Sequence, residues 1–110
     1  TFTRVFEEVL LRNGCSSPAC HGQGAGAAAG ELDLTTPDAA YAALLRTPAR
    51  TLACASQVRV VPGDARSSLL WQKIAPGVSA CGAKMPPAVG AVSPAAAALV
   101  EAWITSGAPR

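Results

Sequence analysis

The stretch CSSPACH, residues 15–21, contains two cysteines and the only histidine of the chain. Two cysteines with a histidine directly after the second are typical of covalent haem attachment, in which the thiols bond the porphyrin vinyl groups and the imidazole binds the iron. The usual pattern has two residues between the cysteines, whereas four separate Cys15 from Cys20. Such a cluster could also bind zinc or form a disulfide, so the choice among haem attachment, zinc binding and a disulfide depends on the rest of the chain.

The composition predicts one domain, residues 1–110, whose own side chains fill a core poorly. Half of the residues are hydrophobic, but only 5% are aromatic and much of the remainder is alanine. Alanine buries little apolar surface per residue, and burial of that surface is the main source of folding free energy. A large, flat apolar cofactor would supply the missing surface.

The charge distribution excludes two classes of partner. The formal net charge is +2 at pH 7, and the nine basic residues are scattered between acidic ones. The chain has neither a lysine-rich tail nor an apolar run long enough to cross a bilayer. We therefore expect a soluble protein that does not span a membrane and does not bind nucleic acid.

The other two cysteines, Cys54 and Cys81, form an even pair. If Cys15 and Cys20 hold a cofactor, the simplest use of this pair in an oxidising compartment is a disulfide. Closing that loop would stabilise the fold by about 3–4 kcal/mol in the chain-entropy model. A covalently held cofactor at Cys15 and Cys20 and a disulfide between Cys54 and Cys81 would both indicate a compartment outside the cytoplasm. No signal peptide precedes Thr1, so we expect a mature or trimmed domain.

Apolar spacing and capping residues predict four helices joined by long loops, which is an all-α fold. The first helix covers residues 3–12 and leads directly into Cys15. The second runs from its N-cap Thr36 to about Arg46, the third from Asp64 to Pro76, and the last from Ser93 to just before Gly107. Residues 58–61 form a short extended piece. Each terminal helix has one narrow apolar face, so we expect the two to pack across each other.

A glycine-rich segment, residues 22–30, follows the histidine. It contains the pattern G-x-G-x-x-A, but no strand precedes it, so a dinucleotide site is not indicated. We interpret the segment as a loop whose glycines allow the backbone to pass close to a bulky group.

The only methionine, Met85, lies between Lys84 and Pro86 in a loop that is too rich in proline and glycine to be helical. Periodic core packing explains a methionine poorly at this position. A thioether and an imidazole are a known pair of axial haem ligands. The loop therefore supplies a candidate partner for His21.

At this point the sequence resembles a known family, the small single-haem c-type cytochrome domains of bacterial extracytoplasmic proteins. The resemblance covers nearly the whole chain in the same order, and its longer attachment spacer is similar to those of some multihaem cytochromes. The segments that carry it are CxxxxCHG (residues 15–22), GELDLT (30–35), YAAL (41–44), VPGD (61–64) with SLL (68–70), MPP (85–87), and LVEAWI (99–104) followed by GAP (107–109).

The resemblance implies a class I cytochrome c fold with one haem c bonded to Cys15 and Cys20. His21 would be the proximal iron ligand and Met85 the distal one. The implied activity is electron transfer rather than catalysis, in the bacterial periplasm or another extracytoplasmic compartment. The implied partner is a redox protein or a fused redox domain, and the domain itself would be monomeric.

The expected haem pocket has an apolar wall and one polar group for a propionate. Arg59 or Trp71 would donate that hydrogen bond, and the second ring nitrogen of His21 would donate to a backbone carbonyl. The residues expected to form the wall are Leu32, Leu34, Tyr41, Leu44, Val61, Trp71 and Ile74.

Three other interpretations remain. One is a haem-based sensor or peroxidase-like domain in which Met85 leaves the iron and opens a coordination position. Another is a domain held by two disulfides, with Cys15 bonded to Cys20. The last is a structural zinc module that uses Cys15, Cys20, His21, Cys54 and Cys81, although adjacent cysteine and histidine are awkward joint ligands.

Overall fold

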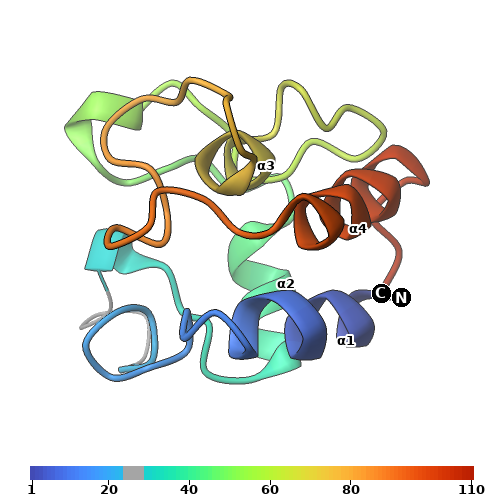
Figure 1. Ribbon diagram of the computed structural model, residues 1–110, viewed down its shortest axis with the longest axis horizontal. Helices are drawn as coiled ribbons and strands as arrows, with labels where there is room; N and C mark the ends of the chain where they lie inside the picture. The colour runs from blue at the N-terminus through green and yellow to red at the C-terminus, as the bar shows by residue number, and fades with distance from the viewer. Residues whose placement is uncertain (24–28) are drawn as a thin grey trace.

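Four short helices and long connecting loops carry the fold of residues 1–23 and 29–110, which the structure, a computed structural model, describes (Figure 1). The helices are α1 (Phe2–Val5), α2 (Pro37–Leu44), α3 (Leu69–Ile74) and α4 (Pro94–Thr105), and three shorter or irregular helical segments are η1 (Phe6–Leu11), η2 (Ala29–Glu31) and η3 (Leu52–Cys54). The only strand-like pairing within the described ranges consists of two isolated bridges, Leu45 with Val60 and Pro48 with Val58. The predicted all-α class is therefore confirmed.

The N-terminal helix leads directly into the cysteine–histidine segment. α1 continues without a break into the π-helical η1, and the apolar face of the two is buried. After Leu11 the chain turns at Gly14, whose φ of 72° is left-handed. The amide of Cys15 then donates to the carbonyl of Leu10 at 3.0 Å, which fixes the first cysteine against the end of the helix.

Side-chain caps start α2 and α4 where the sequence predicts them. Thr36 Oγ1 accepts the amide of Ala39 at 3.2 Å, and Ser93 Oγ accepts the amide of Ala96 at 3.1 Å. Each cap is followed by proline at the first helical position, where no amide is needed. α2 ends at Leu44, two residues before the predicted end at Arg46.

The predicted start of the third helix is wrong. Asp64 caps only an isolated turn, in which its carboxylate accepts the amide of Ser67 at 3.1 Å. Helix α3 begins at Leu69, whose amide donates to the carbonyl of Val58 at 2.9 Å, while Ser68 Oγ accepts the amide of Val61 at 2.8 Å. Contacts with the extended segment therefore set the start of this helix, in place of a local cap.

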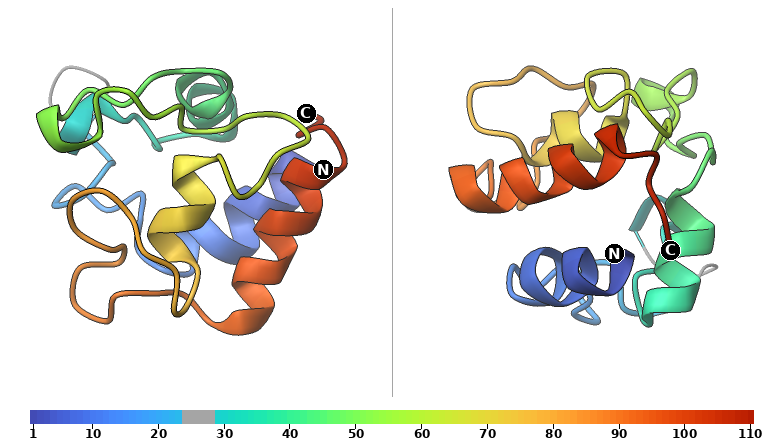
Figure 2. Two further views of the ribbon diagram at one scale, coloured as in Figure 1. Left: turned by 90° about the horizontal axis from the view of Figure 1, so that it is seen from above. Right: turned by 90° about the vertical axis from the view of Figure 1, so that its right-hand side faces the viewer.

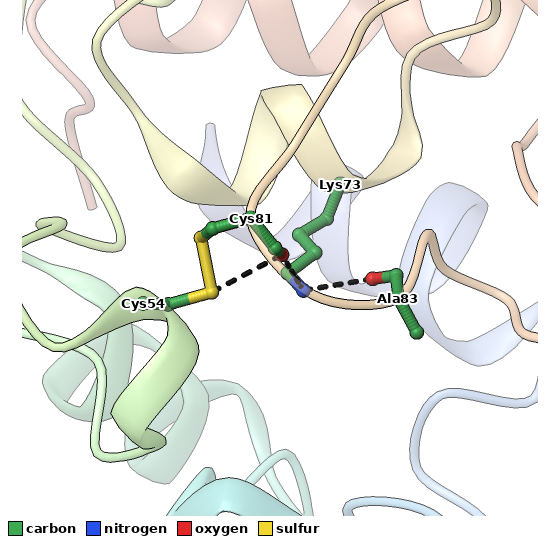
Figure 3. Close-up of a disulfide and its surroundings, with 4 residues drawn as sticks. All are labelled: Cys54, Lys73, Cys81 and Ala83. Atoms are coloured by element: carbon green, nitrogen blue, oxygen red, sulfur yellow. Dashed lines mark hydrogen bonds between the residues drawn. A yellow bond between two sulfur atoms is a disulfide. The ribbon is translucent and has the colours of Figure 1, made fainter.

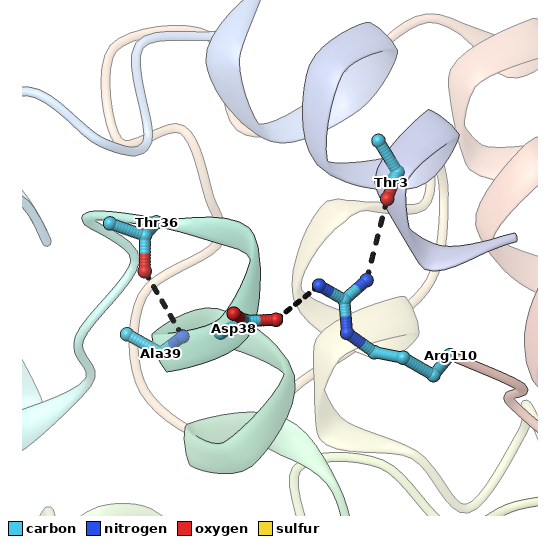
Figure 4. Close-up of polar contacts among 5 residues, drawn as sticks. All are labelled: Thr3, Thr36, Asp38, Ala39 and Arg110. Carbon is cyan, nitrogen blue, oxygen red and sulfur yellow. Dashed lines mark hydrogen bonds and ion pairs between the residues drawn. The ribbon is translucent and has the colours of Figure 1, made fainter.

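The terminal helices contact each other, as predicted, and the two chain ends lie side by side (Figure 2). The buried ring of Phe2 lies 5.1 Å from that of Trp103, centroid to centroid. The guanidinium of Arg110 donates to Thr3 Oγ1 at 3.4 Å and pairs with the carboxylate of Asp38 (Figure 4). The C-terminus is thereby connected to both α1 and α2.

Cys54 and Cys81 are joined, as predicted, with sulfur atoms 2.14 Å apart (Figure 3). The bond connects η3 to the long loop that follows α3. None of the helices in the described ranges is long and apolar enough to cross a membrane.

Candidate functional site

A largely apolar cavity of about 230 Å³ opens between the helices and the connecting loops. Its wall comes from segments that are far apart in the sequence, since η1, α2 and α3 all contribute leucine or isoleucine side chains. Cys15, His21 and Met85, the three residues with the strongest chemical signal in the sequence, line this same cavity. The predicted residues that line it with them are Leu32, Leu34, Leu44, Arg59 and Ile74.

The four-residue spacer between the cysteines is folded into a compact turn. The amide of His21 donates to the carbonyl of Cys15 at 3.0 Å, and this bond brackets the spacer. Inside it, the amide of Cys20 donates to the carbonyl of Ser17 at 2.9 Å, and the side-chain amide of Gln23 donates to the carbonyl of Pro18. The extra residues are therefore accommodated in a turn, while Cys15 and His21 both remain at the cavity wall.

Gly22 holds the end of this turn against its beginning. A Cβ at this position would lie 2.0 Å from the carbonyl oxygen of Ser16, closer than any side chain can approach. The sequence predicts a close approach to a bulky group, and at Gly22 that group is the spacer backbone itself. The rest of the predicted loop includes residues 24–28, which lie outside the described residues.

The surroundings of His21 hold its main chain beside the cavity and keep its imidazole neutral. Its carbonyl accepts the amide of Leu34 at 2.8 Å, which fixes the main chain beside the cavity. Burial lowers the pKa of the imidazole, the backbones of Ala29 and Leu32 oppose this shift, and the positive charge of Arg59 adds to it. The neutral imidazole that results is the form that binds a metal.

The ring nitrogen Nδ1 of His21 is buried and has no hydrogen-bond partner among the described residues. The main chain of Ala29 and Leu32 lies near enough to the ring to affect its pKa, but it makes no hydrogen bond with Nδ1. An unpaired polar atom at this depth is unfavourable unless another interaction uses the ring. Among the described residues, Ser16 Oγ and Trp71 Nε1 are also buried without a hydrogen-bond partner, so the state of Nδ1 does not by itself indicate a bound group.

Burial favours the neutral form of the Cys15 thiol. Its pKa is raised, first by burial and then by the neighbouring Cys20. A neutral thiol and a thioether are both uncharged, so this shift is compatible with a free and with a bonded Cys15. Cys15 and Cys20 are not bonded to each other, and both are partly exposed.

Met85 reaches the cavity from the loop after α3. Its amide donates to the carbonyl of Lys73 at 2.9 Å, so the main chain at Met85 runs beside the helix. The side chain packs against the core at the cavity wall. The loop therefore brings the only thioether of the chain to the same cavity as the only imidazole.

Arg59 supplies a buried positive charge at the cavity. Only 6% of the residue is exposed, and its guanidinium donates to the carbonyls of Ala43 at 2.8 Å and Gly30 at 2.9 Å. Burial lowers its pKa, the nearby Arg50 lowers it further, and Glu31 opposes the shift. A carboxylate in the cavity would compensate this charge.

Four of the residues predicted for the haem site do not line the cavity. Cys20 is partly exposed and lies in the spacer turn, where its amide bonds the carbonyl of Ser17, and the amide of Val61 bonds Ser68 Oγ. The Tyr41 hydroxyl donates to the carbonyl of Ala108 at 2.9 Å, in the aromatic cluster with Phe2 and Trp103. Trp71 is buried on another face of α3, so of the two predicted propionate donors only Arg59 lines the cavity.

Several lining residues were not predicted. Leu10, Leu69 and Leu70 lie on apolar helix faces, which indicate burial without indicating a cavity. Arg50 and Lys73 also line the cavity, and no pattern in the sequence distinguishes them from other surface cations.

A zinc site of five ligands is not assembled. Two of its proposed thiols, Cys54 and Cys81, are bonded to each other. Across residues 1–23 and 29–110, no group of three or more His, Cys, Asp or Glu side chains is placed to hold a metal ion directly.

Comparison of the chain with family models, curated proteins and solved structures gives no match. The chemistry of the cavity is therefore the basis for a functional assignment.

Proposed function

We propose that this protein is an electron-transfer c-type cytochrome with one haem bonded to Cys15 and Cys20, and with His21 and Met85 as axial ligands. The observation that carries the proposal is that Cys15, His21 and Met85, from two distant segments, line one apolar cavity. The lowered pKa of His21 supports it, because the neutral imidazole is the form that binds a metal.

The haem would supply a one-electron couple between ferrous and ferric iron. His21 provides a neutral imidazole, and Met85 provides a thioether that favours the ferrous state and raises the potential. With both positions taken, the protein presents no open coordination position to a substrate. The leucine and isoleucine side chains surround much of the site with apolar groups, which limits the rearrangement around it when its charge changes.

Arg59 would compensate the propionate charge at the polar part of the cavity. Its guanidinium is already oriented by two backbone carbonyls, so little side-chain entropy would be lost when it meets a carboxylate. The proposal further requires that the all-α fold be of the class I cytochrome c type.

The disulfide between Cys54 and Cys81 supports an oxidising compartment, such as the bacterial periplasm. We expect the partner to be a redox protein or a redox domain of the same polypeptide, and the domain to act as a monomer.

The proposal is tested by a redox titration of the protein made in a host with haem-attachment machinery. The oxidised protein should show the methionine-to-iron charge-transfer band and titrate reversibly with one electron. Met85→Ala should keep the haem, lose the band and titrate at a lower potential. Val89→Ala is the matched control, because Val89 lies in the same loop with 73% of its surface exposed, and it should behave as the wild type.

A wild-type protein with attached haem and no such band would contradict the proposed ligation. It would favour the sensor or peroxidase-like alternative, in which Met85 leaves a position open.

A further inference from the structure

Hydrogen bonds from two lysine side chains connect the loop that carries Met85 to α3. Lys84 Nζ donates to the carbonyls of Gln72 at 2.6 Å, Ala75 at 2.7 Å and Val78 at 2.6 Å. Lys73 Nζ donates to the carbonyls of Cys81 at 2.5 Å and Ala83 at 2.7 Å (Figure 3). Together the two ammonium groups use five backbone carbonyls of one short region.

The contacts of Lys84 match the chemistry of an ammonium group. The last carbonyls of a helix have no partners within the helix, and Gln72 and Ala75 lie at the end of α3. An ammonium has three donors and no acceptor, so three converging carbonyls satisfy it completely. Its positive charge also suits the negative end of the helix.

These contacts bear directly on Met85, which is the next residue. The amide of Met85 donates to the carbonyl of Lys73, which holds the main chain against α3. The Lys84 side chain adds a second attachment, because its ammonium group bonds carbonyls at the C-terminal end of the same helix. At the far end of the loop, the amide of Val92 donates to the carbonyl of Ile74 at 2.9 Å. Met85 thus sits between two attachments to the same helix.

We propose that Lys84 is a positioning residue that holds Met85 at the cavity, an inference that rests on the proposed role of Met85 as an iron ligand. Lys84 acts through the main chain, and its own ammonium group is turned to the end of α3. Lys73 supports the outer half of the same loop, next to the disulfide.

The position favours lysine over arginine for a geometric reason. A guanidinium presents its donors in one plane, as a fork suited to a carboxylate. Three carbonyls that converge on one point need the compact, rotatable ammonium. Arginine would keep the charge at position 84 and lose part of the geometry.

The test compares Lys84→Leu, Lys84→Arg and the control Arg12→Leu, which removes an exposed cation at the end of η1. Each protein is prepared in the host with haem-attachment machinery. The two readouts are the methionine-to-iron band and the hydrogen exchange of the Met85 amide, with the amides of α4 as the internal reference. The second readout is independent of haem chemistry.

In Lys84→Leu we expect haem to stay attached, the band to be lost in most molecules, and the Met85 amide to exchange at least about tenfold faster while the α4 amides change little. Lys84→Arg should fall between Lys84→Leu and the wild type, and Arg12→Leu should match the wild type in both readouts.

A wild-type band together with wild-type Met85 exchange in Lys84→Leu would overturn the proposal. If Lys84→Leu does not fold, the same result in Lys84→Arg would overturn it. A wild type that holds haem without the band would instead refute the ligation by Met85, and the exchange of its amide would still decide whether Lys84 holds the loop.

Discussion

Gly22 and its contact with Ser16 explain how the segment from Cys15 to His21 keeps its two ends together despite the four residues between the cysteines. The main chain at Gly22 passes so close to the carbonyl of Ser16 that there is no space for a side chain. The hydrogen bond from His21 to Cys15 closes the same turn. The placement of both Cys15 and His21 at the cavity wall therefore depends on a residue that does not touch the cavity.

Gly22→Ala should destabilise the protein by about 3 kcal/mol, because the new methyl group would collide with the Ser16 carbonyl, and relieving the collision requires the backbone to shift. Urea unfolding measures the change as a lower midpoint at an unchanged slope. The control is Gly14→Ala, where a Cβ would meet no atom and the left-handed φ alone costs about 1 kcal/mol. If the two variants lose equal free energy of unfolding, the close approach at Gly22 does not contribute to the cost of the substitution.

At the scale of the elements, the beginnings of α2 and α4 are set by local capping, and this is why the sequence predicts them. Ser93→Ala removes the side chain that accepts the amide of Ala96, and it should cost about 1 kcal/mol of unfolding free energy. Ser79→Ala, in an exposed part of the loop after α3, should leave the urea midpoint unchanged. A Ser93→Ala protein as stable as the wild type would mean that α4 is started by its tertiary packing.

The elements that the sequence predicts poorly are those whose boundaries depend on distant residues. α3 starts at Leu69 because its first amides bond the carbonyls of Val58 and Arg59, and no local signal near Asp64 reveals this. The end of the N-terminal helix, by contrast, is within one residue of the prediction: η1 ends at Leu11, and the chain turns at Gly14.

The same distinction applies to the candidate site. The placement of Cys15, His21 and Met85 at one cavity agrees with what residue chemistry alone suggests. Apolar spacing shows that Tyr41 and Trp71 have buried or partly buried positions, but it does not show which neighbour covers them. Tyr41 packs in the aromatic cluster near the termini, and Trp71 lies on another face of α3.

Over the whole molecule, the disulfide links two regions that contribute to the cavity wall. Cys54 itself lines the cavity, and Cys81 belongs to the loop that leads to Met85. A small core with few aromatic residues gains from such a link, because the bond restricts the unfolded chain.

Replacing both cysteines, as Cys54→Ala with Cys81→Ala, should lower the free energy of unfolding by about 3–4 kcal/mol, given the 27-residue separation. Urea unfolding of the double variant, and of the wild type after treatment with a dithiol reductant, gives two independent values. A loss below about 1 kcal/mol in both would indicate that the unfolded chain is already restrained in this region.

The central claim is that Cys15 and Cys20 attach one haem, and the mass of the denatured protein tests it most directly. Produced in a host with haem-attachment machinery, the protein should be heavier than its sequence by one haem, and the increment should be found on the peptide that contains both cysteines. The double variant Cys15→Ala with Cys20→Ala should have the unmodified mass. A wild-type protein of unmodified mass, with both cysteines free to react with a thiol reagent after denaturation, would contradict the account.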